Sequence, residues 1–245
     1  MNQQGSHGTT FNFPDIMPIR QTAHTGLIST LQQAVVHPDH DRCGVFLRQA
    51  CAAGLAPDTV RDVVIPAVAR HLGDMWRSDN LAFADVTIAT ARLQGLVRTI
   101  AAHQLPAVRY GEAPTVCVIV PAGTHHTLGA TILVQQLRQR GLSARFMLDA
   151  TPGDLRIALK NGRPDAVFIS SIAAEKLDQV APIVEEVRKL AAAVPVVVGG
   201  PDIISQADIR ALTGADHATR EIETALELCG LNQNRIRAIS AEMMD

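Results

Sequence analysis

Four short apolar runs in the second half of the chain constrain its fold more than any other feature of the sequence. The runs are TVCVIV (115–120), ARFML (144–148), AVFIS (166–170) and VPVVVGG (194–200). Helical stretches separate them, at 124–140, 153–161, 175–193 and 203–213. Strands that alternate with helices pair in parallel, and runs that are apolar on both faces need helices on both sides of the sheet. A short strand at 215–217 and a helix over 219–230 would complete this α/β domain.

Helical patterning dominates the first part of the chain. Between residues 24 and 104, apolar residues recur at spacings of three and four, most clearly over 56–76. Pro57 is expected to begin the third helix, and Pro66 is expected to kink it. Four helices joined by short loops predict a small up-and-down bundle.

Shifts in composition divide the chain into five parts. A polar, aperiodic segment over 1–23 is interpreted as a flexible arm, and the helical bundle follows over 24–104. A linker that contains proline and glycine (105–114) leads into the α/β domain at 115–231, and a polar tail follows at 232–245.

Charge and cysteine content argue against several classes of protein. The net charge is −2 and no run of Lys or Arg occurs, which argues against direct nucleic-acid binding. The four cysteines lie far apart without a CxxC pair, so neither a disulfide framework nor a zinc site is expected. The apolar runs are too short to span a membrane. We therefore predict a soluble, cytoplasmic protein.

The loops after the predicted strands are where an open parallel sheet binds its ligands. They read PAGTHHTLG, SSIAAEK and GGPDII, and none is a Walker loop or a GxGxxG turn. The first loop offers two adjacent histidines, His125 and His126. A loop histidine serves as a metal ligand, a general base or a polar residue at a helix start. No Ser-His-Asp order, carboxylate pair or zinc spacing indicates hydrolytic catalysis, and we expect that the protein is not an enzyme.

The spacing of these loop residues carries a resemblance. His126 precedes Gly129 by three positions, Ser170 ends the third run with Ile172 two residues later, and Gly199–Gly200 end the fourth run. This His-x-x-Gly, Ser-x-Leu/Ile, Gly-Gly order resembles the cobalamin-binding domain family. The resemblance implies a flavodoxin-like (Rossmann-like) parallel sheet of five strands behind the helical bundle.

The resemblance also implies roles for these residues. His126 becomes the lower axial ligand of cobalt, Ser170 contacts the displaced dimethylbenzimidazole tail, and Gly199–Gly200 form a wall of the tail slot. Imidazole is a reasonable ligand for cobalt. The remaining positions of the implied cofactor site, including a histidine that could line the tail slot, are Thr124, His125, Thr127, Leu128, Ser171, Pro201 and His217.

One position departs from the family pattern. The family has Asp or Glu two residues before the ligating histidine, and this chain has Thr124. A carboxylate there would hydrogen-bond the second ring nitrogen and strengthen the ligand. Threonine accepts that bond without a charge, so a weaker and more exchangeable lower bond is expected. His125 is the competing ligand, although its register fits the motif less well than that of His126.

The helical part carries a second set of candidates. In cobalamin light sensors, a Trp that ends a bundle helix is followed ten and eleven residues later by Glu-His, and the bundle caps the upper face of the corrin. Trp76 fits that pattern, but Val86 and Thr87 stand in place of Glu-His, which argues against a large upper group such as adenosyl. Hydroxocobalamin or aquocobalamin is the expected form. Besides water, the candidate upper ligands are His7 on the arm, His24, and His71, which the helical pattern otherwise assigns to the core.

A longer stretch makes the resemblance more specific. MWRSDNLAFADVTIATARLQGLV (75–97), together with the GTHHTLG loop, resembles the AerR/PpaA family of photosynthesis-gene antirepressors, over roughly residues 55–230. That family implies a cobalamin-dependent photoreceptor that regulates transcription without a DNA-binding domain, by contacting a repressor protein. Three alternatives share the scaffold: a corrinoid methyl-carrier protein of a methyltransferase system, a haem-binding redox sensor, and an interaction module without a cofactor.

Overall fold

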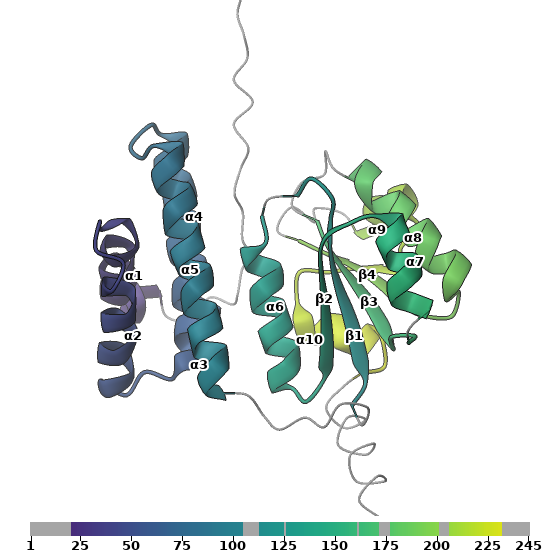
Figure 1. Cartoon of the computed structure of the whole chain (residues 1–245), viewed down its shortest axis with the longest axis horizontal. Coiled ribbons are helices and arrows are strands. Elements are labelled where there is room, and N and C mark those ends of the chain that lie inside the picture. Colours follow the sequence, from purple (N-terminus) through teal and green to yellow (C-terminus); the bar gives the residue numbers. More distant parts are fainter. Residues whose placement is uncertain are drawn as a thin grey trace, which may run out of the picture. The chain divides into compact units, whose positions relative to one another are not determined.

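The fold is taken from a computed structural model that describes residues 21–104, 113–124, 126–160, 162–171, 177–200 and 206–231. These residues form two compact units, with the division between residues 98 and 99 (Figure 1). The predicted boundaries at 104 and 114 stay predictions.

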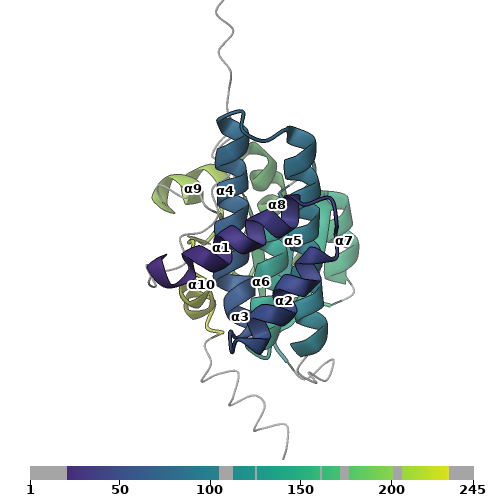
Figure 2. The same ribbon diagram turned by 90° about the vertical axis from the view of Figure 1, so that its left-hand side faces the viewer.

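The first unit is helical, with α1 (Gln21–Val36), α2 (Arg42–Ala52), α3 (Pro57–Thr59), the π-helical turn η1 (Val60–Val64), α4 (Ile65–Arg77) and most of α5 (Phe83–Gln104). Helix α1 begins at Gln21, so it includes the last three residues of the segment predicted to be an arm. In Figure 2, α1 and α2 lie in front of α4 and α5. Fully buried side chains on several helices, such as Leu31, Val64 and Leu93, form the core of this unit. Its description as a four-helix bundle stays a prediction.

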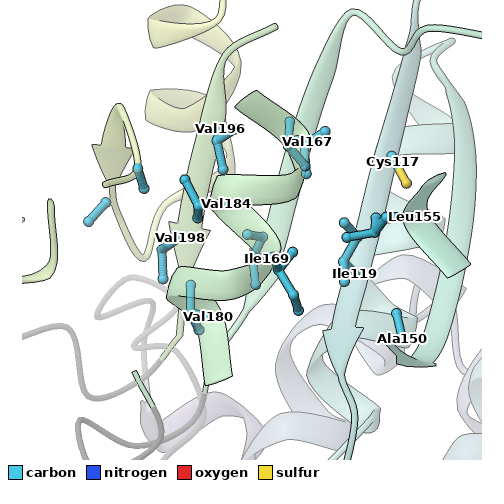
Figure 3. Close-up of a cluster of buried hydrophobic side chains, with 14 of the residues drawn as sticks. Cys117, Ile119, Ala150, Leu155, Val167, Ile169, Val180, Val184, Val196 and Val198 are labelled. Carbon is cyan, nitrogen blue, oxygen red and sulfur yellow. The ribbon is translucent and has the colours of Figure 1, made fainter. Parts of the chain in front are cut away.

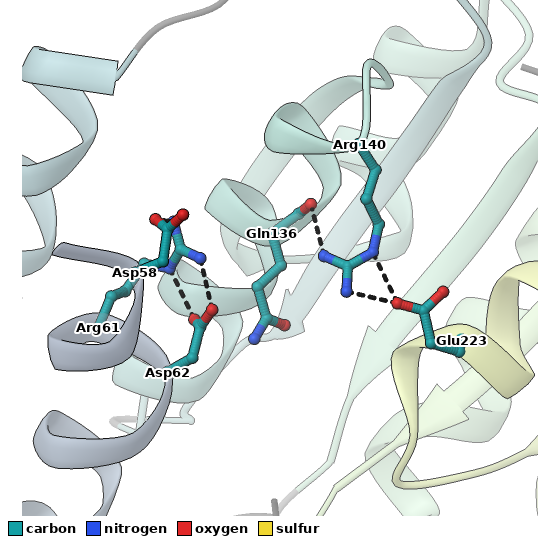
Figure 4. Close-up of polar contacts among 6 residues, drawn as sticks. All are labelled: Asp58, Arg61, Asp62, Gln136, Arg140 and Glu223. Atoms are coloured by element: carbon teal, nitrogen blue, oxygen red, sulfur yellow. Dashed lines mark hydrogen bonds and ion pairs between the residues drawn. The ribbon is translucent and has the colours of Figure 1, made fainter. Parts of the chain in front are cut away.

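The irregularity expected at Pro66 takes the form of a π-helical turn just before it. Helices α3, η1 and α4 follow one another without a gap, and the N–H of Ile65 donates to the carbonyl of Val60, five residues back. Pro66 lies in the first turn of α4, where its missing N–H is tolerated. Within η1, Arg61 is buried, and its Nε donates to Oδ1 of Asp62 at 2.7 Å (Figure 4).

The second unit contains a five-stranded sheet, as predicted. The strands are β1 (Thr115–Pro121), β2 (Ser143–Ala150), β3 (Ala166–Ser170), β4 (Val196–Gly199) and β5 (His217–Ala218). Their order in space is β2-β1-β3-β4-β5, and every neighbouring pair is parallel. The β1–β2 register is irregular between Ile119 and Pro121, where β1 approaches its carboxyl end.

Helices cover both faces of this sheet. Helices α7 (Pro152–Lys160), α8 (Leu177–Leu190) and α9 (Gln206–Thr213) cover one face, and α6 (Leu128–Gln139) and α10 (Ile222–Leu228) cover the other. Alternate residues of β1 point to opposite faces, so Cys117 and Ile119 join the first core (Figure 3) and Val118 joins the second. On the second face, Nε of Arg140 donates to Oε1 of Glu223 at 2.9 Å and so connects α6 to α10 (Figure 4).

Two boundaries matter for the loops at the carboxyl edge. The helix predicted over 124–140 begins only at Leu128, which leaves residues 124–127 in the loop after β1. Strand β2 extends two residues beyond its predicted end at 148. Among the described residues, no helix combines the length and hydropathy that a membrane crossing requires.

Candidate functional site

The order of the strands puts the switch point of the sheet between β1 and β3. From β1 the chain moves outward to β2 on one side, and then returns to β3 on the other side. The loops that follow β1 and β3 therefore run in opposite directions at the carboxyl edge of the sheet, which is where folds of this kind bind ligands. His126 lies in the loop after β1, and Ser170 is the last residue of β3.

The loop after β1 holds His126 at the start of α6. Gly123 has φ +74°, a left-handed conformation that glycine adopts without steric cost. The N–H of Thr124 donates to the carbonyl of Pro121 at 3.2 Å, which closes the turn, and Thr124 is 9% exposed. His126 is half-buried two residues later, and Thr127 occupies the N-cap position of α6 without a side-chain capping hydrogen bond. A half-buried imidazole at a fixed helix start is suited to ligate a metal. His125 lies outside the described residues.

Gly129 leaves open space beside this loop. It lies in the first turn of α6, and its φ is not left-handed. A Cβ built on Gly129 would meet no atom within 4 Å, whereas the preceding Leu128 is buried in the core. Neither the backbone conformation nor the packing of the chain requires glycine here. The glycine therefore fits a position where a bound group approaches the helix.

The ends of β3 and β4 bring the serine and glycine positions together. Ser170 pairs in register with Gly199, and the N–H of Ser171 donates to the carbonyl of Gly199 at 2.8 Å. A Cβ on Gly199 would make only an ordinary contact, 3.5 Å from the carbonyl of Thr219, and Gly200 follows half-buried. Small residues therefore stand together where β3 and β4 end. Ile172 and Pro201 lie outside the described residues.

Another candidate for the tail slot lies on the last strand. His217 begins β5, pairs with Val197 of β4 and is half-buried.

On β1, burial raises the pKa of the Cys117 thiol to about 11, which keeps it protonated and unsuited to bind a metal.

The candidates in the helical unit have mixed environments. Trp76 is half-buried near the end of α4, and its ring centroid lies 6.0 Å from that of Phe83, with the planes tilted by 54°. Val86 is buried and Thr87 is exposed, its hydroxyl donating to the carbonyl of Phe83. The interpretation of His71 as a core residue was wrong, because His71 is exposed.

The two other candidates for the upper ligand are at the start of the chain. His24 is half-buried on α1. His7 lies outside the described residues.

Sequence reasoning missed one residue of this edge. Asp149, on β2, has φ +51°, and its Oδ1 accepts the N–H of Gly123 at 2.7 Å. The adjacent carbonyl of Ala150 accepts the N–H of Ala122 at 3.2 Å. The end of β2 therefore holds the start of the histidine loop. An aspartate directly after an apolar run, at the edge where the loop residues gather, was the available signal.

Comparison with known proteins agrees with this geometry. Residues 114–229 match the model of the B12 binding domain family. The chain is also 34% identical over 164 residues to the "Uncharacterized 20.5 kDa protein in bchF-crtJ intergenic region" of Rhodobacter capsulatus, covering 66% of this chain and 85% of that protein. Among solved structures, the monomethylamine corrinoid protein of Methanosarcina barkeri matches with a TM-score of 0.62 and 17% identity, over 90% of this chain and 99% of that one. At that identity the likeness concerns the fold.

Proposed function

This chain belongs to the same family as the Rhodobacter capsulatus protein and is a cobalamin-binding protein, and from that premise we propose that it is a light-responsive transcriptional antirepressor. In this proposal it is a cytoplasmic protein without enzymatic activity. It binds a DNA-binding repressor protein and has no direct contact with nucleic acid. The location of the relative's gene in a photosynthesis gene cluster supports the regulatory part.

The histidine loop after β1, at the point where the strand order reverses, is the observation that carries the proposed cobalamin site. The donor set fits the group: a half-buried imidazole at His126, open space at Gly129, and the small residues at the ends of β3 and β4. His126 would hold cobalt from below, Ser170 would contact the nucleotide tail, and Gly199–Gly200 would line its slot. Bound cobalamin supplies a coloured cobalt centre whose upper ligand can be exchanged by light.

The regulatory output is assigned to the helical unit, which we take to be a four-helix bundle. Its exposed aromatic ring at Phe83, 65% exposed and next to Trp76, and the exposed Ile88 are the features of that unit most suited to a protein contact. Val86 and Thr87, in place of Glu-His, support water or hydroxide rather than adenosyl as the upper group. A change of that ligand shifts the population between two states with different partner affinity.

A methyl-carrier function is the second candidate. It would use the same fold and the same His126, and the printed name of the Methanosarcina barkeri structure is that of a corrinoid protein. A carrier must accept and return a methyl group in darkness, whereas a sensor must respond to illumination. A haem-binding sensor is the third candidate, since histidine also ligates haem iron.

The test is a titration of the purified full chain with hydroxocobalamin, in darkness and after illumination. We expect stoichiometric binding with a shifted corrin spectrum. His126→Ala should lower the affinity on the order of 100-fold or more, because loss of a ligand exceeds the 10–100-fold cost of losing its supporting contacts. His125→Ala tests the competing ligand, and His103→Ala, an exposed histidine on α5, is the matched control.

Labelling identifies the ligating atom. With bound cob(II)alamin, a histidine ligand labelled with 15N changes the nitrogen splitting of the electron paramagnetic resonance spectrum, and the cofactor's own benzimidazole does not. Light-minus-dark hydrogen exchange should change in the helical unit. Failure to retain any corrinoid would contradict the sensor and the carrier, and the same sample would then be titrated with haem.

A further inference from the structure

The first three N–H groups after the last residue of β1 all have acceptors, and two of these acceptors lie at the end of β2. Ala122 donates to the carbonyl of Ala150 at 3.2 Å, Gly123 to Oδ1 of Asp149 at 2.7 Å, and Thr124 to the carbonyl of Pro121 at 3.2 Å. The histidine loop therefore leaves the sheet in a fixed direction. Of these three acceptors, Oδ1 of Asp149 belongs to a side chain, and the other two are backbone carbonyls.

The backbone of Asp149 is held in an unfavourable conformation. Its φ of +51° is left-handed, and among the described residues only Asp79 shares this feature without being glycine. Aspartate tolerates this region better than most residues, but the conformation still costs free energy. Glycine would adopt it freely. Position 149 therefore holds a residue whose backbone is strained and whose side chain accepts the N–H of Gly123.

We propose that Asp149 is the positioning residue of the His126 loop. It acts from β2 on the backbone of the loop, whereas an acidic residue at position 124 would act on the imidazole itself. By fixing Gly123, three residues before His126, it reduces the conformational freedom that the loop loses when the imidazole binds cobalt, and such preorganisation raises affinity. Asp149 itself does not touch the metal. This inference rests on the proposed cobalamin site.

Substitutions at Asp149 separate the carboxylate from the backbone. Asp149→Gly removes the acceptor and relieves the left-handed conformation, so the chain should fold at least as well as the wild type. Asp149→Asn keeps an amide oxygen that can accept the bond and also tolerates this backbone region. Asp165→Ala is the matched control, because Oδ2 of Asp165 accepts the N–H of Thr115, also at 2.7 Å, where β1 begins rather than where it ends.

Three measurements on the full chain test the proposal. They are the Kd for hydroxocobalamin, the fraction of bound cob(II)alamin that carries a 15N-histidine signal, and hydrogen exchange of the Gly123 amide without cofactor. For Asp149→Gly we expect a Kd about 10-fold higher, at the lower end of supporting-contact effects. We also expect a smaller histidine-ligated fraction and faster exchange at Gly123. Asp149→Asn and Asp165→Ala should stay within about twofold of the wild-type Kd.

Each contrary result overturns the proposal. An unchanged Kd and signal in Asp149→Gly would leave the residue without a positioning role. An equal loss in Asp165→Ala would assign the effect to general stability, and an equal loss in Asp149→Asn would assign it to charge rather than to the hydrogen bond. If the wild type binds cobalamin without a histidine signal, or does not bind it, the proposed site fails and this inference fails with it.

Discussion

At the edge of the sheet where the strands begin, two aspartates make the same closed arrangement. Asp165 precedes β3, and its N–H and Oδ2 form a reciprocal pair of hydrogen bonds with Thr115, the first residue of β1. Asp216 precedes β5 and forms the same pair with Val196, the first residue of β4. Each pair satisfies backbone groups that would otherwise lie at the end of the ladder. These hydrogen bonds stabilise the sheet at the edge where its strands begin.

The edge where the strands end uses an aspartate differently. Asp149 also accepts a backbone N–H at 2.7 Å, but from a loop residue and at the cost of a left-handed φ. At the same edge of the sheet, a Cβ at Gly129 would meet no atom within 4 Å, and a Cβ at Gly199 would make only an ordinary contact. At one edge, an aspartate that accepts a backbone N–H thus joins two neighbouring strands. At the other edge, the same kind of contact holds the loop after β1. That difference between the edges supports the proposed site at the carboxyl edge of the sheet.

Among the substitutions that test this comparison of the edges, the largest effect is expected from filling the space at Gly129. Gly129→Leu adds a side chain where the chain itself offers no obstacle within 4 Å. If a cofactor occupies that space, overpacking of about 3 kcal/mol should raise the Kd for hydroxocobalamin roughly 100-fold. Without cofactor, the free energy of unfolding should stay equal or rise by up to about 1 kcal/mol, because glycine is unfavourable in helices. Spectral titration and urea unfolding measure the two quantities.

Gly26→Leu is the control for this comparison. Gly26 lies on α1, and a Cβ there also meets nothing within 4 Å. It should give the same small change in unfolding and leave the Kd unchanged. Tight binding of cobalamin by Gly129→Leu would show that the open space at the carboxyl edge serves no ligand.

A smaller effect is expected at the opposite edge, on stability alone. Burial alone would raise the pKa of Asp216, but the hydrogen bonds from Arg188 and from the N–H of Val196 outweigh it, and the pKa of Asp216 is lowered. Asp216→Ala should lower the free energy of unfolding at pH 7 by about 1 kcal/mol, since the pair is partly exposed, and leave the Kd unchanged.

The pH dependence of that loss has a defined sign. A carboxyl whose pKa is lower in the folded state stabilises the fold above its unfolded pKa of about 3.9, and this stabilisation disappears as the pH falls through the folded value. The difference in urea-unfolding free energy between wild type and Asp216→Ala should therefore be full at pH 7 and shrink below pH 4. A difference that grows on acidification would assign the effect to something other than this carboxylate.

The sequence predicted the alternation of strands and helices well, because periodicity and β-branched content follow burial directly. The run 166–170 coincides with β3. The sequence pattern could not place Asp149 in β2, because aspartate is unfavourable in strands. The residues that extend β2 do so because they pair with β1, which is a tertiary effect. His71 was misassigned for a related reason. The π turn at Val60–Val64 adds a residue to one helical turn, so the buried face shifts by about one position after it. Val68 and Leu72 stay buried, Ala69 and Gly73 join them, and His71 is exposed.

The smallest expected effect concerns substitutions made at both edges together. Their effects on the free energy of unfolding and on the Kd should be independent of each other. Strand β1 has seven residues, so its two ends lie roughly 20 Å apart at about 3.3 Å per residue. Effects on stability at such separations add to within about 0.5 kcal/mol. The double variant Asp149→Gly/Asp165→Ala should therefore unfold with the sum of the two single changes, and its Kd for hydroxocobalamin should equal that of Asp149→Gly. Urea unfolding and spectral titration of all four proteins complete the cycle. A Kd coupling of tenfold would mean that β1 transmits strain from one edge to the other, so that the edge we assign to stability also sets the position of His126.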